Sequence, residues 1–133
     1  MAPSNKTNST FFAPHLAIID LRPAVDFYQK AFGAIVLQKW EHEGRLHVAE
    51  LEIKGALFHI HEETTRSRQL SPETVKATTA VIGLFTSEPD ELFNQAAAAG
   101  GTVGSQMQDY EYGYRQGTII DPFGHQWLIQ KKI

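Results

Sequence analysis

The sequence predicts an α+β domain made of two pseudo-symmetric β-α-β-β-β units. Two observations lead to this prediction. The order strand, helix, strand, strand, strand occurs twice along the 133 residues, and the two copies align without gaps at their most regular points. Gly33 then corresponds to Gly101 after each helix, and "GALFHI" corresponds to "GHQWLI" in the last strands. We expect the units to form a curved sheet around a ligand cleft, with the helices on the other face.

The first unit is expected between residues 13 and 62. "HLAII" is typical of a short strand, and "LRPAVDFYQKAFGA" is typical of a helix with Pro23 in its first turn and Gly33 as its C-terminal stop. Three strands follow in "IVLQKW", "LHVAELEI" and "ALFHIHE". The last two strands are joined by the pair Lys54-Gly55, which favours a tight hairpin.

A polar connector over residues 63–77 leads to the second unit, expected between residues 78 and 133. Within it, Ser71-Pro72-Glu73 can cap one short helical turn, but the segment is too polar to belong to the core. The second unit repeats the pattern, with "TTAVIGLF" as a strand and "PDELFNQAAAAGG" as a helix. Its remaining strands are expected in "TVGSQMQ", "YRQGTII" and "HQWLIQ".

Composition excludes several classes of function. A formal charge of −3, with scattered Lys and Arg, gives no basic field for nucleic acid. The absence of cysteine excludes thiol catalysis, disulfides and Cys-ligated metals. The polar start "MAPSNKTNST" lacks the apolar run of a signal peptide, and no later stretch could span a bilayer. We therefore expect a cytoplasmic protein with a flexible tail over residues 1–12 and a small-molecule ligand.

The first hairpin fixes which side chains face the cleft. If Lys54-Gly55 is a two-residue turn, Leu51 pairs with Phe58 on the helix side and Glu50 lies opposite His59 on the cleft side. A carboxylate beside an imidazole favours the charged imidazolium, so the pair can serve as a catalytic acid and base. The alternative is a polar cross-strand pair on a wet sheet face.

The C-terminal stretch "IIDPFGHQWLIQ" contains a second turn. Asp121-Pro122-Phe123-Gly124 is typical of a type I turn in which Gly124 adopts a positive φ as a bulge. Trp127 then faces the helix side as the counterpart of Phe58, each packed under its own helix. His125 shares this orientation, which predicts a structural role with a hydrogen bond near the turn.

Polar side chains of both units are expected to line the cleft and bind the ligand. They are His15, His59, His61, Tyr114, Gln116 and Gln126, with Glu50 and His59 as the catalytic candidates. Tyr110, Tyr112 and Tyr114 alternate as in a wall for a flat ligand or in an ordinary half-buried strand. Arg115 points away from the cleft, where an ion pair can fix the loop. His42 and His47 are expected to be structural or exposed.

The doubled unit, "AVDFYQKAFGA", "SPE" and "YGYRQGTIIDPFGHQW" together resemble the vicinal oxygen chelate superfamily, and within it the PhnB-like group of glyoxalase/bleomycin-resistance relatives. The resemblance implies the glyoxalase/bleomycin resistance fold and, because most members are dimers, a homodimer. Members include metal-dependent isomerases, ring-cleaving dioxygenases, thiol transferases and binding proteins without chemistry. The resemblance therefore leaves open whether this chain is an enzyme.

Metal-using members hold a divalent ion through four positions, which fall here on Ala13, His59, Val81 and Leu128. Only His59 can bind a metal. The loss of three of the four ligands, with the cleft retained, favours a small-molecule-binding protein without a metal cofactor.

Two enzymatic alternatives remain. His15, Glu50 and His59 could hold a displaced divalent transition metal in a lyase, isomerase or dioxygenase-like enzyme. Glu50 and His59 could also transfer protons in an enzyme without a cofactor.

Overall fold

A computed structural model describes residues 9–133, so most of the expected tail lies outside the described residues. The elements follow the predicted order. The first unit contains β1 (His15–Ile18), α1 (Leu21–Phe32), β2 (Ile35–His42), β3 (Arg45–Ile53) and β4 (Ala56–Glu62). After the short helix α2 (Pro72–Val75), the second contains β5 (Val81–Phe85), α3 (Pro89–Ala98), β6 (Thr102–Tyr110), β7 (Tyr114–Ile120) and β8 (Gln126–Lys132).

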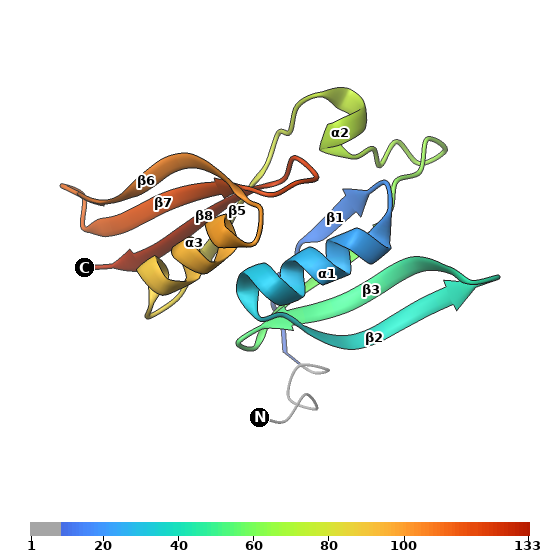
Figure 1. The fold of residues 1–133 in the computed structure, drawn as a ribbon, viewed down its shortest axis with the longest axis horizontal. Coiled ribbons are helices and arrows are strands. Elements are labelled where there is room, and N and C mark those ends of the chain that lie inside the picture. Colours follow the sequence, from blue (N-terminus) through green and yellow to red (C-terminus); the bar gives the residue numbers. More distant parts are fainter. Residues whose placement is uncertain (1–8) are drawn as a thin grey trace.

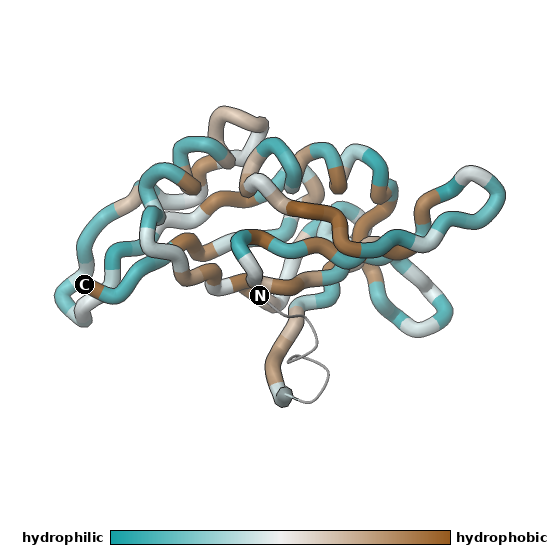
Figure 2. The backbone as a smooth tube through the Cα atoms, turned by 90° about the horizontal axis from the view of Figure 1, so that it is seen from below, coloured by the Kyte–Doolittle hydropathy of each residue, from teal (hydrophilic) through white to brown (hydrophobic). Residues whose placement is uncertain are grey.

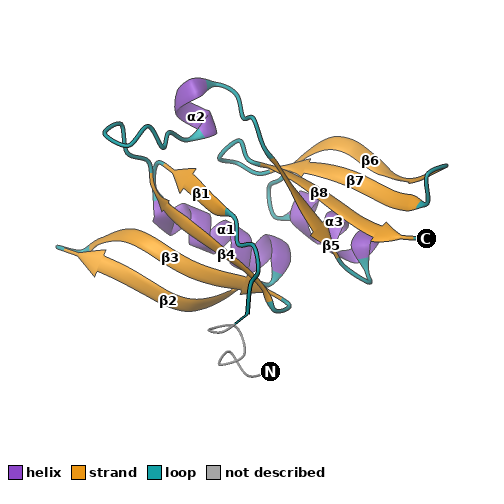
Figure 3. Cartoon of the chain, turned by 180° about the vertical axis from the view of Figure 1, so that it is seen from behind, coloured by secondary structure: helices purple, strands orange, loops and turns teal. Residues whose placement is uncertain are grey.

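The two units have the same sheet topology, which confirms the predicted repeat. The strand orders are β1-β4-β3-β2 and β5-β8-β7-β6, and the first pair in each sheet is parallel (Figure 1). Both sheets are curved, with α1 and α3 on the same side of the molecule and the strands along the other side (Figures 2 and 3). Within residues 9–133, no helix has the length and apolar content needed to cross a bilayer.

Both predicted hairpin registers are confirmed. Across Lys54-Gly55, Leu51 pairs with Phe58 and Glu50 pairs with His59. In the second unit Ile119 pairs with Trp127. These registers direct the apolar side chains of both sheets towards the helices and leave the polar side chains of β3 and β4 on the opposite face.

The buried side chains form one continuous core that spans both units. Trp127 is 1% exposed, and its ring lies 4.7 Å from that of Phe32 and 5.6 Å from that of Tyr28, both on α1. It is also 5.5 Å from Phe58. Trp127 therefore also packs against the helix of the first unit, which the sequence did not predict. Because α1 and α3 contact each other, aromatic side chains of α1 reach β8 in the other unit.

The turn before β8 is built around one buried carboxylate. The amide of Gly124 donates to the carbonyl of Asp121 at 3.0 Å, and Gly124 has a φ of 92°, as predicted. The side chain of Asp121 accepts four hydrogen bonds, from the Tyr28 hydroxyl, the Trp127 indole and the backbone amides of Phe123 and His125. A buried carboxylate is stable when its oxygens are satisfied in this way.

The connector contributes to the buried part of the molecule, contrary to expectation. Ser71 is fully buried and caps α2 by accepting from the amide of Thr74, while its own amide donates to Glu63 at 3.0 Å. Pro72 is buried as well. The segment can enter the core because its buried polar groups have hydrogen-bond partners within it.

Candidate functional site

A cavity of about 760 Å³ lies where the first sheet meets the connector. It collects five of the six histidines of the chain, and we call it the histidine cavity. It is lined by His15, Ala17, His47, Val48, His59, His61, Glu62, Thr64, Arg68, Gln69, Leu70 and His125. Strand pairing places several of these side chains in adjacent positions on one sheet face.

One row across this face contains the predicted acid-base pair. Glu50 lies between Gln38 of β2 and His59 of β4, and His15 of β1 completes the row. The Glu50 Oε2 is 3.2 Å from the His59 Nε2, and the two side chains are 24% and 21% exposed. The structure therefore brings together three predicted site residues, with the carboxylate within reach of the imidazole.

The next row contains His61. It runs from Trp40 through Val48 and His61 to Ala17. Trp40 is 45% exposed at the edge strand, a large apolar side chain on the cleft face that sequence reasoning did not single out. The strand pairing could have predicted this position, because Trp40 lies opposite Val48, and Val48 lies opposite His61 on the same sheet face.

The rings of His15 and His59 are stacked, with centroids 4.4 Å apart and planes 14° from parallel. Burial lowers the pKa of His15, and the nearby positive charges of His59 and His61 lower it further. The cavity thus crowds imidazoles together, which disfavours additional positive charge on His15.

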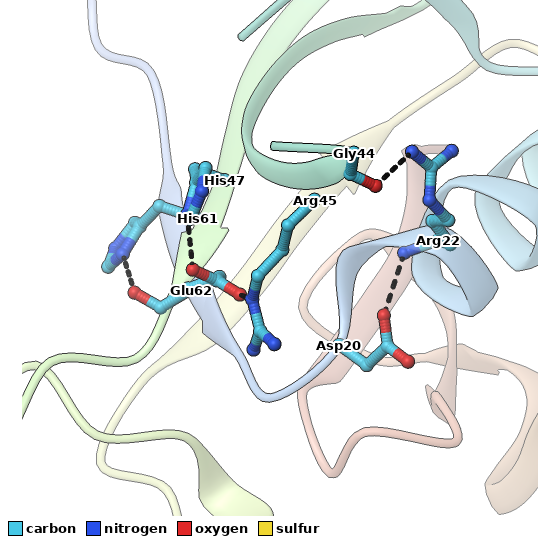
Figure 4. Close-up of polar contacts among 7 residues, drawn as sticks. All are labelled: Asp20, Arg22, Gly44, Arg45, His47, His61 and Glu62. Atoms are coloured by element: carbon cyan, nitrogen blue, oxygen red, sulfur yellow. Dashed lines mark hydrogen bonds and ion pairs between the residues drawn. The ribbon is translucent and has the colours of Figure 1, made fainter. Parts of the chain in front are cut away.

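Glu62, which lines the cavity, makes polar contacts with three neighbouring residues (Figure 4). Its Oε1 lies 2.5 Å from the Nδ1 of His47, its Oε2 bonds Arg45, and its backbone carbonyl accepts from the Nδ1 of His61 at 2.9 Å. Partial burial opposes ionisation of Glu62, but the hydrogen bonds from Arg45 and His47 outweigh it and lower the pKa. His47, expected to be structural or exposed, also lines the cavity.

The connector forms the outer wall of the cavity through Thr64, Arg68, Gln69 and Leu70. The backbones of Thr64 and Gln69 exchange two hydrogen bonds of 2.8 and 2.9 Å, which close this loop. Sequence reasoning missed these residues because a polar connector carries no periodic signal that could place it against a sheet.

His125 is held as predicted but also forms part of the cavity wall. Its backbone amide bonds Asp121 at 3.0 Å, and its Nε2 donates to the carbonyl of Ala17 at 2.9 Å. Since Ala17 lies on β1, this bond ties the turn of the second unit to the first.

The other predicted ligand-binding residues lie on the second sheet and do not line the histidine cavity. Gln116 accepts from the Tyr112 hydroxyl at 2.6 Å and donates to Gln130 at 2.8 Å. Tyr114 lies in a surface aromatic row, with its ring 5.7 Å from that of Tyr112. Gln126 begins β8. The structure thus gathers the histidines but not these three side chains.

Arg115 makes the predicted ion pairs. It bonds both carboxylate oxygens of Asp90 at 2.8 and 2.7 Å and one oxygen of Asp109 at 3.0 Å. These hydrogen bonds, above all those to Asp90, raise the pKa of Arg115 and keep the guanidinium charged. The arginine thus fixes the start of α3 to β7 and β6.

The residues present do not fit the metal site implied by the family resemblance. Ala13, Val81 and Leu128 offer no side-chain donor for a metal. In the displaced set, the rings of His15 and His59 are stacked on each other and Glu50 contacts His59. Among residues 9–133, no group of three or more His, Asp or Glu side chains is arranged to hold a metal ion.

Comparison with known sequences gives a consistent family. Residues 11–129 match the profile of the Glyoxalase/Bleomycin resistance protein/Dioxygenase superfamily. An uncharacterized protein of Mycobacterium bovis is 32% identical over 125 residues, which cover 91% of this chain and 82% of that protein. A similar uncharacterized protein of Mycobacterium tuberculosis is also 32% identical, with 74% of its length covered.

Solved structures share the fold. TioX from Micromonospora sp. ML1 is 24% identical, with a TM-score of 0.73, over 93% of this chain and 97% of that one. The fosfomycin resistance protein FosX of Listeria monocytogenes is 18% identical, with a TM-score of 0.68, over 94% of each chain. A variant of FosX has been crystallised with Mn(II) and a dihydroxypropylphosphonic acid. At these identities the likeness extends to the fold alone.

Proposed function

Because the chain belongs to the glyoxalase/bleomycin resistance protein/dioxygenase superfamily, we propose that it binds a small molecule in the histidine cavity, without a resident metal. The observation that carries this proposal is the convergence of five of six histidines on one cavity. The volume of about 760 Å³ falls in the usual range of small-molecule sites, roughly 300 to 1,000 Å³. Ala17, Val48 and Leu70 add an apolar lining.

A thermal-shift screen of aromatic and dicarbonyl compounds tests the proposal, because a ligand that binds only the folded state raises its Tm. A hit should lose most of its shift in the His61→Gln variant, since this ring lies inside the cavity. The matched control is His42→Gln, whose exposed ring lies outside the cavity. An equal loss of shift in both variants would count against the histidine cavity as the site.

A cofactor-free enzyme is the second candidate, favoured by the 3.2 Å contact between Glu50 and His59. In this role the carboxylate would hold the imidazole in position and stabilise its charged form during proton transfer. The Glu50→Gln variant would then bind the substrate but turn it over at least about 100-fold more slowly. Unchanged turnover in that variant would exclude the pair as the acid-base catalyst.

We also propose that residues 13–133 act as one domain and that the protein is a cytoplasmic homodimer of the PhnB-like group. Support for the group comes from "YGYRQGTIIDPFGHQW". Support for the dimer comes from large apolar side chains exposed on strands, which a partner would cover. They are Ile35, Leu37, Trp40, Val81 and Phe85. Light scattering that gives a mass near 14.9 kDa at micromolar concentration would contradict the dimer.

A further inference from the structure

We propose that the ligand of the histidine cavity carries an oxyanion, such as a carboxylate, sulfonate or phosphoryl group, which is bound by Arg68 together with His15. This inference rests on the proposed function and adds the chemical class of the ligand. Three observations support it: Arg68 lines the cavity without forming an ion pair within the described part of the chain, the loop backbone at Arg68 is held by hydrogen bonds, and His15 lines the cavity as a second donor.

Two carboxylates at or beside the cavity, Glu62 and Glu50, contact basic side chains other than Arg68. Glu62 lines the cavity but is bonded to Arg45 and His47. Glu50 lies beside the cavity and contacts His59. Neither carboxylate forms an ion pair with Arg68, so the positive charge of this guanidinium has no carboxylate partner among the described residues at the cavity.

Arg68 supplies that charge. Of the five arginines, Arg22, Arg45 and Arg115 form ion pairs with carboxylates. Arg68 forms no ion pair with any carboxylate of residues 9–133, although it lines the cavity. A guanidinium is charged at any physiological pH and presents a planar set of donors suited to two oxygens of an oxyanion.

The backbone around Arg68 is held in an uncommon conformation. Arg68 has a φ of 60°, in the left-handed region that residues other than glycine rarely adopt. The paired backbones of Thr64 and Gln69 close the loop, and the Arg68 amide donates to the carbonyl of Thr65 at 3.2 Å. These bonds hold the main chain at Arg68 in place, while the exposed side chain is available to a ligand.

His15 provides a second donor on the sheet side of the cavity. Its ring stacks on His59, so its orientation is set by a neighbour. A neutral imidazole has one N–H donor, and a protonated one has two. An oxyanion between Arg68 and His15 would thus receive donors from both walls of the cavity.

A pair of probes that differ in charge tests this inference. Benzenesulfonate and methyl phenyl sulfone both carry a phenyl ring on a tetrahedral sulfur, but only the sulfonate is an anion. Isothermal titration calorimetry at neutral pH should show that benzenesulfonate binds at least about tenfold more tightly than the sulfone, because charge-assisted hydrogen bonds are the stronger kind. If the sulfone binds with equal or higher affinity, the inference that the ligand carries an oxyanion is wrong, and the proposed function is unaffected.

Variants of the connector loop assign the effect to Arg68. In Arg68→Gln the affinity for benzenesulfonate should fall at least about tenfold, and Arg68→Lys should recover part of it by restoring the charge. Arg66→Gln is the matched control, since Arg66 lies in the same loop but does not line the cavity. A urea unfolding curve for each variant verifies that it is folded.

Two further outcomes would overturn the inference. They are an Arg68→Gln variant that binds benzenesulfonate as the wild type does, and a wild type that does not bind it at all. In either case the compound screen above still decides the proposed function by itself.

Discussion

The hydroxyl of Tyr28 on α1 donates a hydrogen bond of 2.5 Å to the buried carboxylate of Asp121, which lies 93 positions further along the chain. The same carboxylate accepts from the indole of Trp127 at 2.9 Å. One side chain thus links the helix of the first unit to the last turn and strand of the second. Burial, followed by the charge of Asp121, raises the pKa of Tyr28 well above its usual value.

Replacing Tyr28 with phenylalanine should lower the free energy of unfolding by about 1.5 to 3 kcal/mol at neutral pH, because a buried hydrogen bond to a charged group is lost. Since the pKa of Tyr28 is raised in the folded state, this residue stabilises the fold fully below the unfolded pKa of about 10 and less as pH rises further. Urea titrations between about pH 9 and 11 should therefore show a shallower loss of stability in the variant. Equal slopes for both proteins would contradict this.

The Glu62→Gln variant should lose about 1 kcal/mol of stability at neutral pH, since the contacts with Arg45 and His47 weaken. The pKa of Glu62 is lower in the folded state than its unfolded value of 4.5. The stabilisation by this carboxylate is therefore complete above pH 4.5 and is lost as the pH falls through the folded-state pKa. The difference between variant and wild type should therefore shrink in strong acid, as measured by urea unfolding. Glu43→Gln, at a side chain that is 85% exposed, should show no such difference at either pH.

The fold and half of the candidate site could be predicted because local rules decide them. The two-residue turn at Lys54-Gly55 sets the register that places Glu50 opposite His59. The alternation of side chains along each strand then determines which residues face the helix and which face the cavity. Two contacts depend instead on how segments far apart in the sequence pack together. They are the packing of Trp127 against α1 and the position of Arg68 beside the first sheet. No period or turn motif encodes such docking, so sequence reasoning missed both.

The same limit explains why the site was expected to include both units. Tyr114, Gln116 and Gln126 share a face of the second sheet, as strand parity requires. Parity says which face a side chain is on but not whether two sheets direct those faces into one cavity. The histidine cavity is instead closed by the connector, and the second unit contributes His125 to its lining.

Gly124→Ala should destabilise the fold more than Gly55→Ala. Both glycines have a φ of 92°, so alanine would adopt the unfavourable left-handed region at either position. A Cβ at Gly124 would lie 2.6 Å from the Cβ of Pro72, whereas one at Gly55 would have no atom within 4 Å. We expect the Gly124 variant to lose about 1 to 3 kcal/mol more than the Gly55 variant in urea unfolding, the usual cost of overpacking. Equal losses would show that Pro72 moves away without cost.

Replacing His59 with glutamine should raise the pKa of His15, because one of its two positive neighbours is removed. The value should stay below 6.5, since burial is the larger cause of the shift and His61 remains. An NMR titration of the His15 ring measures the change, with His42→Gln as a control that should leave it unaltered. An unchanged His15 titration in the His59 variant would show that the two rings are not close neighbours in solution.

The central claim is that the histidine cavity binds the ligand, and NMR of the imidazole rings tests it most directly. A compound found by the thermal-shift screen is added stepwise while the ring signals of the six histidines and the side-chain amides of Gln116 and Gln126 are followed. We predict that His15, His59 and His61 shift together and saturate with one Kd, while His42 stays in place. Unmoved imidazole signals, with shifts confined to Gln116 and Gln126, would place the ligand on the second sheet and contradict the account.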